Sequence, residues 1–433
     1  MDNMTIGIIG MAGILGLIAL HVPIGIAMAV AGFLSVAGIL GWGPAISLLG
    51  TEPTSALANR ELFVIPLFLL MGSLASAGGL SDDLYRLANA FLGHYRGGLA
   101  MATIGGCAGF GTVCGSSVAT TATMARVALP QMLERGYSPA LATGSIAAGG
   151  TLGILIPPSV IMVLYAFLTE QFIVDLFIAA VIPGTIAVML DLAAINIYMR
   201  LKPGAAKTEP RMPWRERWPV IRRSSGAIAL FAIVTGGIYI GIFTVNEAAA
   251  VGAVVALGIA VGRGRIDRRV LVAVLSETAA NTAMIYTLII GASVASYFVA
   301  LSQLSPALIS AIQGSGLAPM IIILLLLVMY FILGCIFETV SSMILTLPFV
   351  FPLITALGYD PVWWGIVNVM VIEIGLITPP IGLNVFVMHG MARHIPLKTI
   401  FAGIAPFLCA DVTRLLLITF IPWLALWLPS TMK

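Results

Sequence analysis

Apolar runs of membrane-spanning length follow one another along most of this chain. The hydrocarbon core of a bilayer is about 30 Å thick and takes about 20 helical residues to cross. By that measure the sequence predicts spans at residues 4–20, 24–41, 61–79, 139–172, 174–199, 227–243, 247–262, 278–300, 361–391 and 398–427. Residues 139–172 and 361–391 are interrupted by Gly and Pro, so we expect broken helices there. The predicted fold is an all-α polytopic membrane protein.

Two segments, 98–133 and 318–356, fit this measure badly. Each consists of two apolar arms around a polar middle, Gly111 to Ser117 in one and Gly334 to Ser342 in the other. We interpret both as re-entrant helical hairpins that return to their own side of the membrane. Each half of the chain then crosses the bilayer an odd number of times, and the second half must be inverted relative to the first.

A duplication supports this interpretation. Residues 130–165 and 352–387 align without a gap at a constant offset of 222, and the four prolines of each stretch coincide. We therefore predict a first inverted repeat at 1–201 (hairpin 98–133, broken helix 139–172), a cytoplasmic linker at 202–225, and a second inverted repeat at 226–433 (hairpin 318–356, broken helix 361–391). Segments 81–96 and 302–315 are short and amphipathic and are either interfacial helices or simple loops.

The charges are few and unevenly placed. Charged residues make up 9% of the chain and hydrophobic residues 60%, whereas soluble proteins average about 25% and 45–50%. The predicted connections 81–97, 133–138, 200–225, 263–269 and 392–398 contain 17 of the 21 Lys and Arg residues, the exceptions being Arg60, Arg126, Arg414 and Lys433. Because cytoplasmic loops collect basic residues, we place these connections in the cytoplasm and both termini in the periplasm. No basic stripe suggests nucleic acid.

Catalytic and transition-metal motifs are missing from the sequence. The N-terminus lacks a basic leader, so we expect a retained first span. The four cysteines sit singly in apolar runs, and the histidines show no metal-ligand spacing. Neither a Walker sequence nor a Ser-His-Asp arrangement is present. We therefore predict no enzyme activity and no bound cofactor.

The two helix breaks, Gly153 to Pro158 and Gly375 to Pro380, are the strongest candidate sites. Proline removes a helix hydrogen bond, and unwound carbonyls in transporters coordinate ions such as Na⁺. A purely structural kink is the alternative for each break. In a membrane protein, breaks at corresponding places in two halves indicate the binding site of a secondary transporter.

The hairpin middles supply further polar groups. The first offers Gly115, Ser116, Ser117, Thr120 and Thr121, and the second offers Glu338, Thr339, Ser341 and Ser342. Glu338 could bind a cation or cap a helix.

Further charged residues lie inside the predicted spans and the first hairpin. Glu373 could bind a cation, carry a proton or pair with Asn368. Arg126 could snorkel to the interface or contact an anionic substrate. Asp411 and Arg414 are expected to pair.

At these motifs the chain resembles the large membrane subunit of the tripartite ATP-independent periplasmic (TRAP) transporters, the DctM-like family. The most specific matches are the segments 65–72, 93–100, 115–119, 149–159 and 375–384. The family's usual Asp-rich second tip carries Glu338 instead. The resemblance implies an elevator transporter of the bacterial inner membrane, with Na⁺ between each hairpin tip and its broken helix. It also implies a small four-helix (DctQ-like) membrane subunit and a periplasmic (DctP-like) protein that delivers an organic acid.

From the breaks, the tips and this resemblance we expect two sets of ligands. The cation-binding set is Gly115, Ser116, Ser117, Gly150, Thr151, Gly153, Pro157, Gly334, Glu338, Thr339, Gly375, Thr378 and Pro379. The substrate-binding set is Ser117, Thr120, Ser159, Ser341 and Asn384. A carboxylate symporter or antiporter that needs no binding protein is the alternative function.

Overall fold

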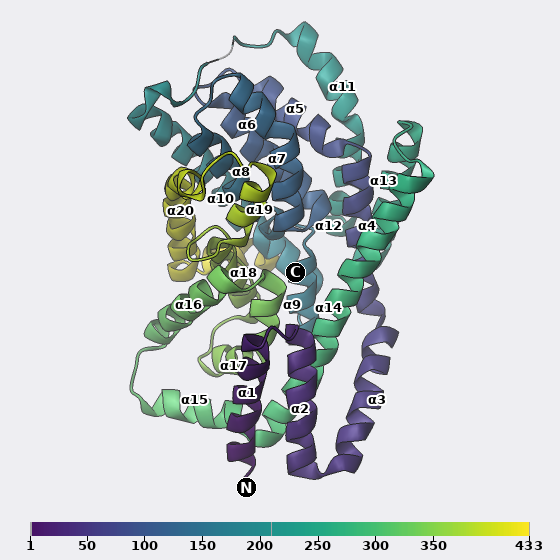
Figure 1. Cartoon of the computed structure of the whole chain (residues 1–433), viewed down its shortest axis with the longest axis vertical. Coiled ribbons are helices and arrows are strands. Elements are labelled where there is room, and N and C mark those ends of the chain that lie inside the picture. Colours follow the sequence, from purple (N-terminus) through teal and green to yellow (C-terminus); the bar gives the residue numbers. More distant parts are fainter. Residues whose placement is uncertain (1, 209, 433) are drawn as a thin grey trace.

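The chain folds entirely into helices over the residues that the computed structural model describes, 2–208 and 210–432 (Figure 1). Met1, Glu209 and Lys433 lie outside this range. The helices of the first half are α1 (Asn3–Ala19), α2 (Ile24–Leu40), α3 (Trp42–Ala58), α4 (Val64–Ala77), α5 (Leu80–Leu92), α6 (Gly98–Cys114), α7 (Ser117–Glu134), α8 (Pro139–Leu155), α9 (Val160–Thr169) and α10 (Ile173–Leu201). Those of the second half are α11 (Trp214–Phe231), α12 (Gly237–Tyr239), α13 (Val245–Gly262), α14 (Arg268–Ser302), α15 (Leu304–Gly314), α16 (Pro319–Ile336), α17 (Thr339–Ala356), α18 (Pro361–Leu376), α19 (Leu383–Met391), α20 (Leu397–Phe420) and α21 (Trp423–Thr431).

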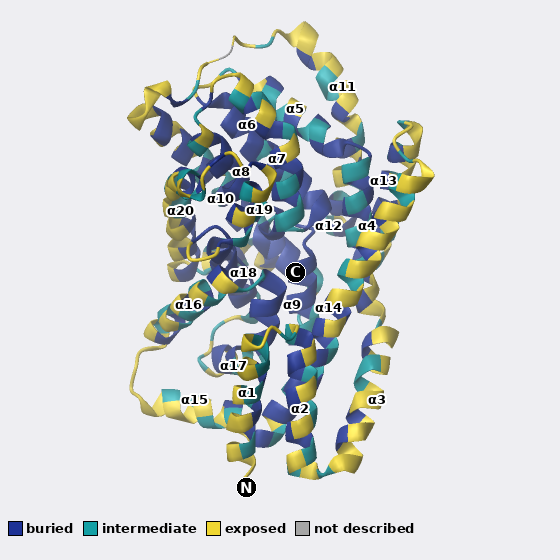
Figure 2. Ribbon diagram, viewed as in Figure 1, coloured by how far each residue is buried: buried dark blue, intermediate teal, exposed yellow. Residues whose placement is uncertain are grey.

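The prediction of an all-α membrane protein is confirmed. Nine helical segments of the described chain are long and apolar enough to cross a bilayer. Burial varies widely among them: 83% of the residues in the most apolar 18-residue stretch of α8–α9 are buried, whereas 33% are buried in α16. Figure 2 shows the same contrast between a buried centre around α8, α9 and α18 and the exposed outer faces of α3, α13 and α16. The broken helices are therefore at the core of the molecule.

The two halves contain the same arrangement of helices, and helices of one half pack against helices of the other. Each contains a helical hairpin, α6–α7 or α16–α17, followed by a broken helix, α8–α9 or α18–α19. Helix α2 packs along α14, and its repeat equivalent α13 packs along α4. Similarly, α9 contacts α17 while α19 contacts α7. Such reciprocal contacts are expected for two units related by a two-fold axis, in agreement with the predicted inverted repeat.

The sequence prediction missed one helix and misplaced others. Helix α3 was not expected, because Gly50, Glu52 and Pro53 interrupt its apolar pattern. Its repeat equivalent is the first half of α14, which starts ten residues before the predicted span 278–300 because Asp267 caps a polar first turn. The predicted span 398–427 divides into α20 and α21 at Ile421 and Pro422. The segments 81–96 and 302–315 contain α5 and α15, so the loop alternative for them is wrong.

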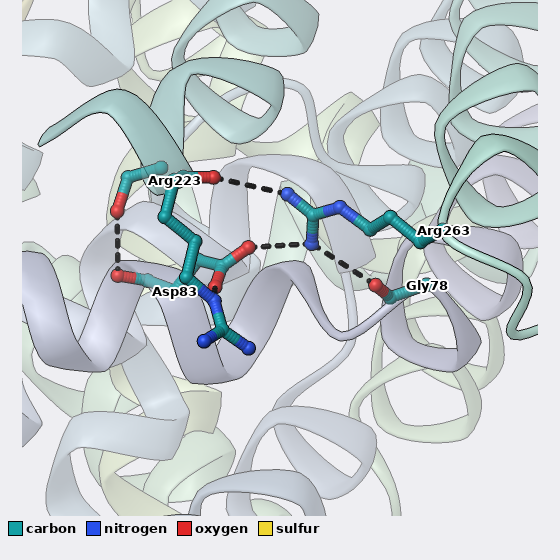
Figure 3. A network of polar contacts seen from close by, with 5 residues as sticks. Gly78, Asp83, Arg223 and Arg263 are labelled. Atoms are coloured by element: carbon teal, nitrogen blue, oxygen red, sulfur yellow. Dashed lines mark hydrogen bonds and ion pairs between the residues drawn. The ribbon is translucent and has the colours of Figure 1, made fainter. Parts of the chain in front are cut away.

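A buried carboxylate holds α5 to the second half of the chain (Figure 3). Asp83 accepts hydrogen bonds from Arg223 Nε at 3.0 Å and from Arg263 Nη1. Arg263 also donates to the carbonyls of Gly78 (3.1 Å) and Arg223 (3.0 Å), and Ser224 Oγ donates to the Asp83 carbonyl (2.9 Å). Helix α5 is thereby fixed to α11 and to the end of α13.

A second ion-pair cluster is fully buried between α18 and α20. Arg414 Nη2 lies 3.0 Å from Asp411 Oδ1, which confirms the predicted pair, and 3.6 Å from Glu373 Oε2. Asn368, the other partner considered for Glu373, has no hydrogen bond to it. The partner of Glu373 is therefore Arg414.

Candidate functional site

A cavity of about 880 Å³ lies between the hairpins and the helices α4 and α14. Both hairpin tips reach it, the first with Ser116 and Ser117 and the second with Glu338 and Thr339. On the side of the first tip, the cavity wall continues along one face of α7, through Ala119, Ala122, Thr123 and Arg126. The opposite wall is formed by α4 and α14 and carries Ser73, Ser76, Glu277 and Asn281. The cavity therefore joins the two repeated motifs to a separate pair of helices.

The first tip rests on the break of α8–α9. Helix α6 ends at Cys114, Gly115 takes a positive φ of 62°, and Ser116 caps α7 by accepting a hydrogen bond from Ala119 N at 3.4 Å. A Cβ on Gly115 would lie 3.4 Å from Val160 N and 3.5 Å from the Pro158 carbonyl. Glycine is favoured here because of the left-handed backbone, and the tip is in van der Waals contact with the break.

Two glycines on α8 leave room for oxygen atoms of the first tip. A Cβ on Gly153 would lie 2.7 Å from Thr120 Oγ1 and 3.2 Å from the Ser116 carbonyl. One on Gly150 would overlap Thr121 Oγ1 and lie 3.2 Å from the Ser117 carbonyl. The hydroxyls of Thr120 and Thr121 are buried without a hydrogen-bond partner, as is that of Ser159 in the break. Buried polar atoms nearly always have a partner, so these oxygens are available to a ligand.

The second tip has the same plan with different side chains. Glu338 occupies the position equivalent to Ser116, and its Oε2 accepts a hydrogen bond from Val340 N at 3.1 Å, so it does cap α17. Gly334 packs against α18, where its Cβ would lie 2.7 Å from the Ile372 carbonyl, and Gly375 packs against Gly334. Thr339 Oγ1 and Ser342 Oγ are buried without partners. Unpaired hydroxyl oxygens therefore occur at both tips.

Hydrogen bonds join the two motifs directly. Asn384, at the start of α19, donates from Nδ2 to Ser117 Oγ at 2.6 Å and to the Ala147 carbonyl at 3.2 Å. Its Oδ1 is buried and has no partner. The second broken helix is thus attached to the first hairpin tip.

The structure brings together some predicted site residues and separates others. Gly115, Ser116, Ser117, Glu338 and Thr339 line the cavity, whereas Thr120, Ser159, Ser341 and Asn384 lie outside its lining. Thr151 Oγ1 and Thr378 Oγ1 donate to carbonyls of their own helices, Ala148 (2.7 Å) and Ile374 (2.6 Å), so only their lone pairs are free. Pro157 and Pro379 lie in the two breaks, between α8 and α9 and between α18 and α19.

Several polar residues of the cavity were not expected from the sequence, among them Arg265, Glu277 and Asn281. Glu277 and Asn281 are one turn apart on α14, and Arg265 precedes that helix. Polar residues spaced by one turn in an apolar helix could have indicated a cavity face, but the prediction began this span at 278.

The donor set of the tips suits a hard cation. Hydroxyl and carbonyl oxygens predominate, and no group of three or more His, Cys, Asp or Glu residues suited to a metal occurs in the described chain. Oxygen ligands favour alkali and alkaline-earth ions over transition metals. Near mid-membrane such irregular backbone is tolerated where it is buried or lines a cavity.

Paired hairpins and broken helices around one polar cavity, in a chain of membrane-spanning helices, define a membrane transport protein. The family described as "Tripartite ATP-independent periplasmic transporter, DctM component" matches residues 11–424. The chain therefore belongs to the DctM family, the large permease subunits of TRAP transporters.

Individual relatives support this assignment. The chain is 37% identical over 374 residues to the C4-dicarboxylate TRAP transporter large permease protein DctM of Pseudomonas aeruginosa, covering 86% of this chain and 87% of that protein. It is 32% identical over 441 residues to the protein of that name from Vibrio cholerae, covering 96% of each. The crystal structure of the Alcanivorax borkumensis YdaH transporter, described as having an unusual topology, matches with a TM-score of 0.63 over 90% of each chain at 16% identity. That match concerns the fold alone.

Proposed function

We propose that this chain imports an organic acid, of the dicarboxylate class, across the bacterial inner membrane by co-transport with Na⁺. Its proposed partners are a small four-helix membrane subunit and a periplasmic protein that delivers the acid. The observation that carries the Na⁺ proposal is the set of unpaired buried hydroxyls at both tips, Thr120 and Thr121 in one motif and Thr339 and Ser342 in the other. The C4-dicarboxylate names of two relatives support the substrate class.

An elevator movement is the proposed mechanism. The hairpins and broken helices would move as one body against α2, α4, α13 and α14, because α19 contacts α7 and α9 contacts α17. The cavity lining includes Ser81, Asp82 and Arg265, from connections whose basic residues predict the cytoplasmic side. The present arrangement then corresponds to a cavity open to the cytoplasm, with both chain termini in the periplasm.

Na⁺ supplies the driving force in this proposal. Each positive charge that moves inward gains about 2.3 kcal/mol per 100 mV, so uptake responds to voltage when the Na⁺ charge exceeds that of the acid. The unwound breaks offer carbonyls, and the N-termini of α7 and α17 offer partial positive charge to an anion. The cation and the acid would therefore bind next to each other at the tips.

Uptake by the reconstituted complex tests the proposal. Proteoliposomes containing both membrane subunits should accumulate labelled succinate only with an inward Na⁺ gradient and with the periplasmic protein present. Replacing Na⁺ by K⁺ should abolish accumulation, and Thr120→Val should raise the Na⁺ concentration that gives half-maximal uptake. Equal uptake in K⁺ would refute Na⁺ coupling, and uptake without the periplasmic protein would favour the independent carboxylate carrier.

A further inference from the structure

Arg126 is the basic residue that the hairpins contribute to the described cavity lining. It follows Ser117 by nine residues, which is about 13 Å along a helix at 1.5 Å per residue. Ala119, Ala122, Thr123 and Arg126 line the cavity together, so they form one face of α7 that leads from the tip to the guanidinium. The side chain is exposed on this wall, which favours the substrate interpretation of Arg126 over snorkelling toward lipid.

The guanidinium has no protein partner among the described residues: no hydrogen bond or ion pair of Arg126 occurs there. Two other arginines, Arg263 and Arg414, are paired with the buried carboxylates of Asp83 and Asp411, whereas Arg265 lines the cavity without an ion pair among the described residues. Of the cavity's other acids, Glu277 lies on α14 in the opposite wall and Asp82 lies on α5, and neither forms an ion pair among the described residues. Glu338, on the hairpin side, already accepts a hydrogen bond from α17. Arg126 is therefore a free cation on the wall that carries both tips.

The spacing fits a short acid with two charged ends. Side chains on a helix tilt toward its N-terminus, so Arg126 leans toward the tip. A four-carbon dicarboxylate in zigzag measures roughly 6 Å between its outermost oxygens. With a charge-assisted hydrogen bond of about 2.8 Å at each end, the acid spans roughly 12 Å, close to the separation of about 13 Å. Its far carboxylate would then meet the N-terminus of α7, where backbone N–H groups favour anions.

We propose that Arg126 binds one carboxylate of the transported acid, while the tip binds the other end. This inference rests on the proposed function, and it goes beyond it by naming the residue that recognises the anion. Arginine suits the role because its planar fork can form two parallel hydrogen bonds to a carboxylate. Lysine would retain the charge but lose the second bond.

Binding to the purified chain in lipid nanodiscs provides the test, with succinate as the probe. Thermal unfolding is measured against succinate concentration in NaCl, with choline chloride at equal ionic strength as a control. Arg126→Gln should weaken succinate binding roughly ten- to hundredfold, the usual effect of losing a charge-assisted hydrogen bond. Succinate binding by Arg126→Lys should be weaker than that of the wild type and stronger than that of Arg126→Gln. Arg265→Gln, which removes another unpaired cation from the same cavity, is the matched control and should change binding less than twofold.

The outcomes separate this inference from the proposed function. Equal weakening by Arg126→Gln and Arg265→Gln would mean that the cavity's general field attracts the acid, and would overturn the assignment. Unchanged binding in Arg126→Gln would overturn it as well. If Na⁺ stabilises the wild type but none of succinate, L-malate and fumarate does, the assignment fails while Na⁺ binding stands. If Na⁺ has no effect on stability either, the proposed function itself fails.

Discussion

Replacing Gly153 by alanine tests the packing of the first tip on α8. The new Cβ would lie 2.7 Å from Thr120 Oγ1 and 3.2 Å from the Ser116 carbonyl. Alanine in a helix is favoured over glycine by about 1 kcal/mol, whereas overpacking a dense site costs about 1–3 kcal/mol. We therefore expect a net loss of stability of about 0–2 kcal/mol from these two effects. The loss should be larger in Na⁺, since the Cβ fills the space beside the proposed ligands.

Gly258→Ala is the matched control. It also lies inside a helix, α13, and a Cβ there would meet no atom within 4 Å. Only the propensity gain of up to about 1 kcal/mol is expected, so the two variants should differ by about 1–3 kcal/mol.

Thermal unfolding in nanodiscs, in NaCl and in KCl, gives both quantities. Gly153→Ala should unfold at a lower temperature than Gly258→Ala in either salt. It should also need at least about tenfold more Na⁺ for half-maximal stabilisation, which at saturating Na⁺ corresponds to about 1.4 kcal/mol. If Gly153→Ala matches Gly258→Ala in both measurements, neither the tight packing nor the cation site at this glycine is correct.

Three further predictions concern other parts of the chain. Asp83→Ala should reduce the free energy of unfolding by about 1–3 kcal/mol, because Arg263 loses its buried partner while Arg223 is half exposed. Asp82 forms no ion pair among the described residues, so Asp82→Ala should change the free energy of unfolding by no more than about 0.5 kcal/mol. Equal melting temperatures of the two variants would contradict this. Arg414→Met should cost about 3–5 kcal/mol by leaving Glu373 and Asp411 without a cation, and adding Glu373→Gln should recover part of that loss; no recovery would argue against the pair. In a Cys409→Ser background, cysteine at Glu134 should label only from the cytoplasm and cysteine at the repeat-equivalent Ala356 only from the periplasm, and labelling of both from one side would refute the inverted orientation.

The two hairpins and two breaks could be predicted because they are duplicated. A single Gly-Pro break in an apolar run can be explained as a structural kink. Four prolines that coincide at a constant offset indicate a duplicated unit instead. The cap positions were also readable in part, since Ser116 and Glu338 precede helical arms in equivalent places. Helix α3 could not be predicted in the same way, because its repeat equivalent is the polar beginning of α14 and neither segment is a continuous apolar run.

The opposite cavity wall could be predicted only in part. The one-turn spacing of Glu277 and Asn281 indicates a polar face of α14, but only packing places that face in the same cavity as α7. Likewise, the sequence already supplied Asp411 as a partner for Arg414 on the same helix, so nothing in it indicated the contact of Arg414 with Glu373 on another helix. Contacts between elements far apart in sequence depend on helix crossing geometry, which apolar periodicity does not encode.

Comparison of equivalent positions separates what the fold needs from what the transported ions need. Backbone roles are kept in both repeats: Gly153 and Gly375 each allow a hairpin to approach, and Pro158 and Pro380 each lie in the break between two helices. Side-chain roles differ, since Ser116 corresponds to Glu338 and Thr151 to Glu373. The second repeat therefore brings two carboxylates where the first has hydroxyls, one capping α17 and one paired with Arg414. The same backbone forms with either set of side chains, so the hydroxyls of the first repeat are not required to neutralise a charge. We therefore expect cation affinity to respond most directly to substitutions at the first tip.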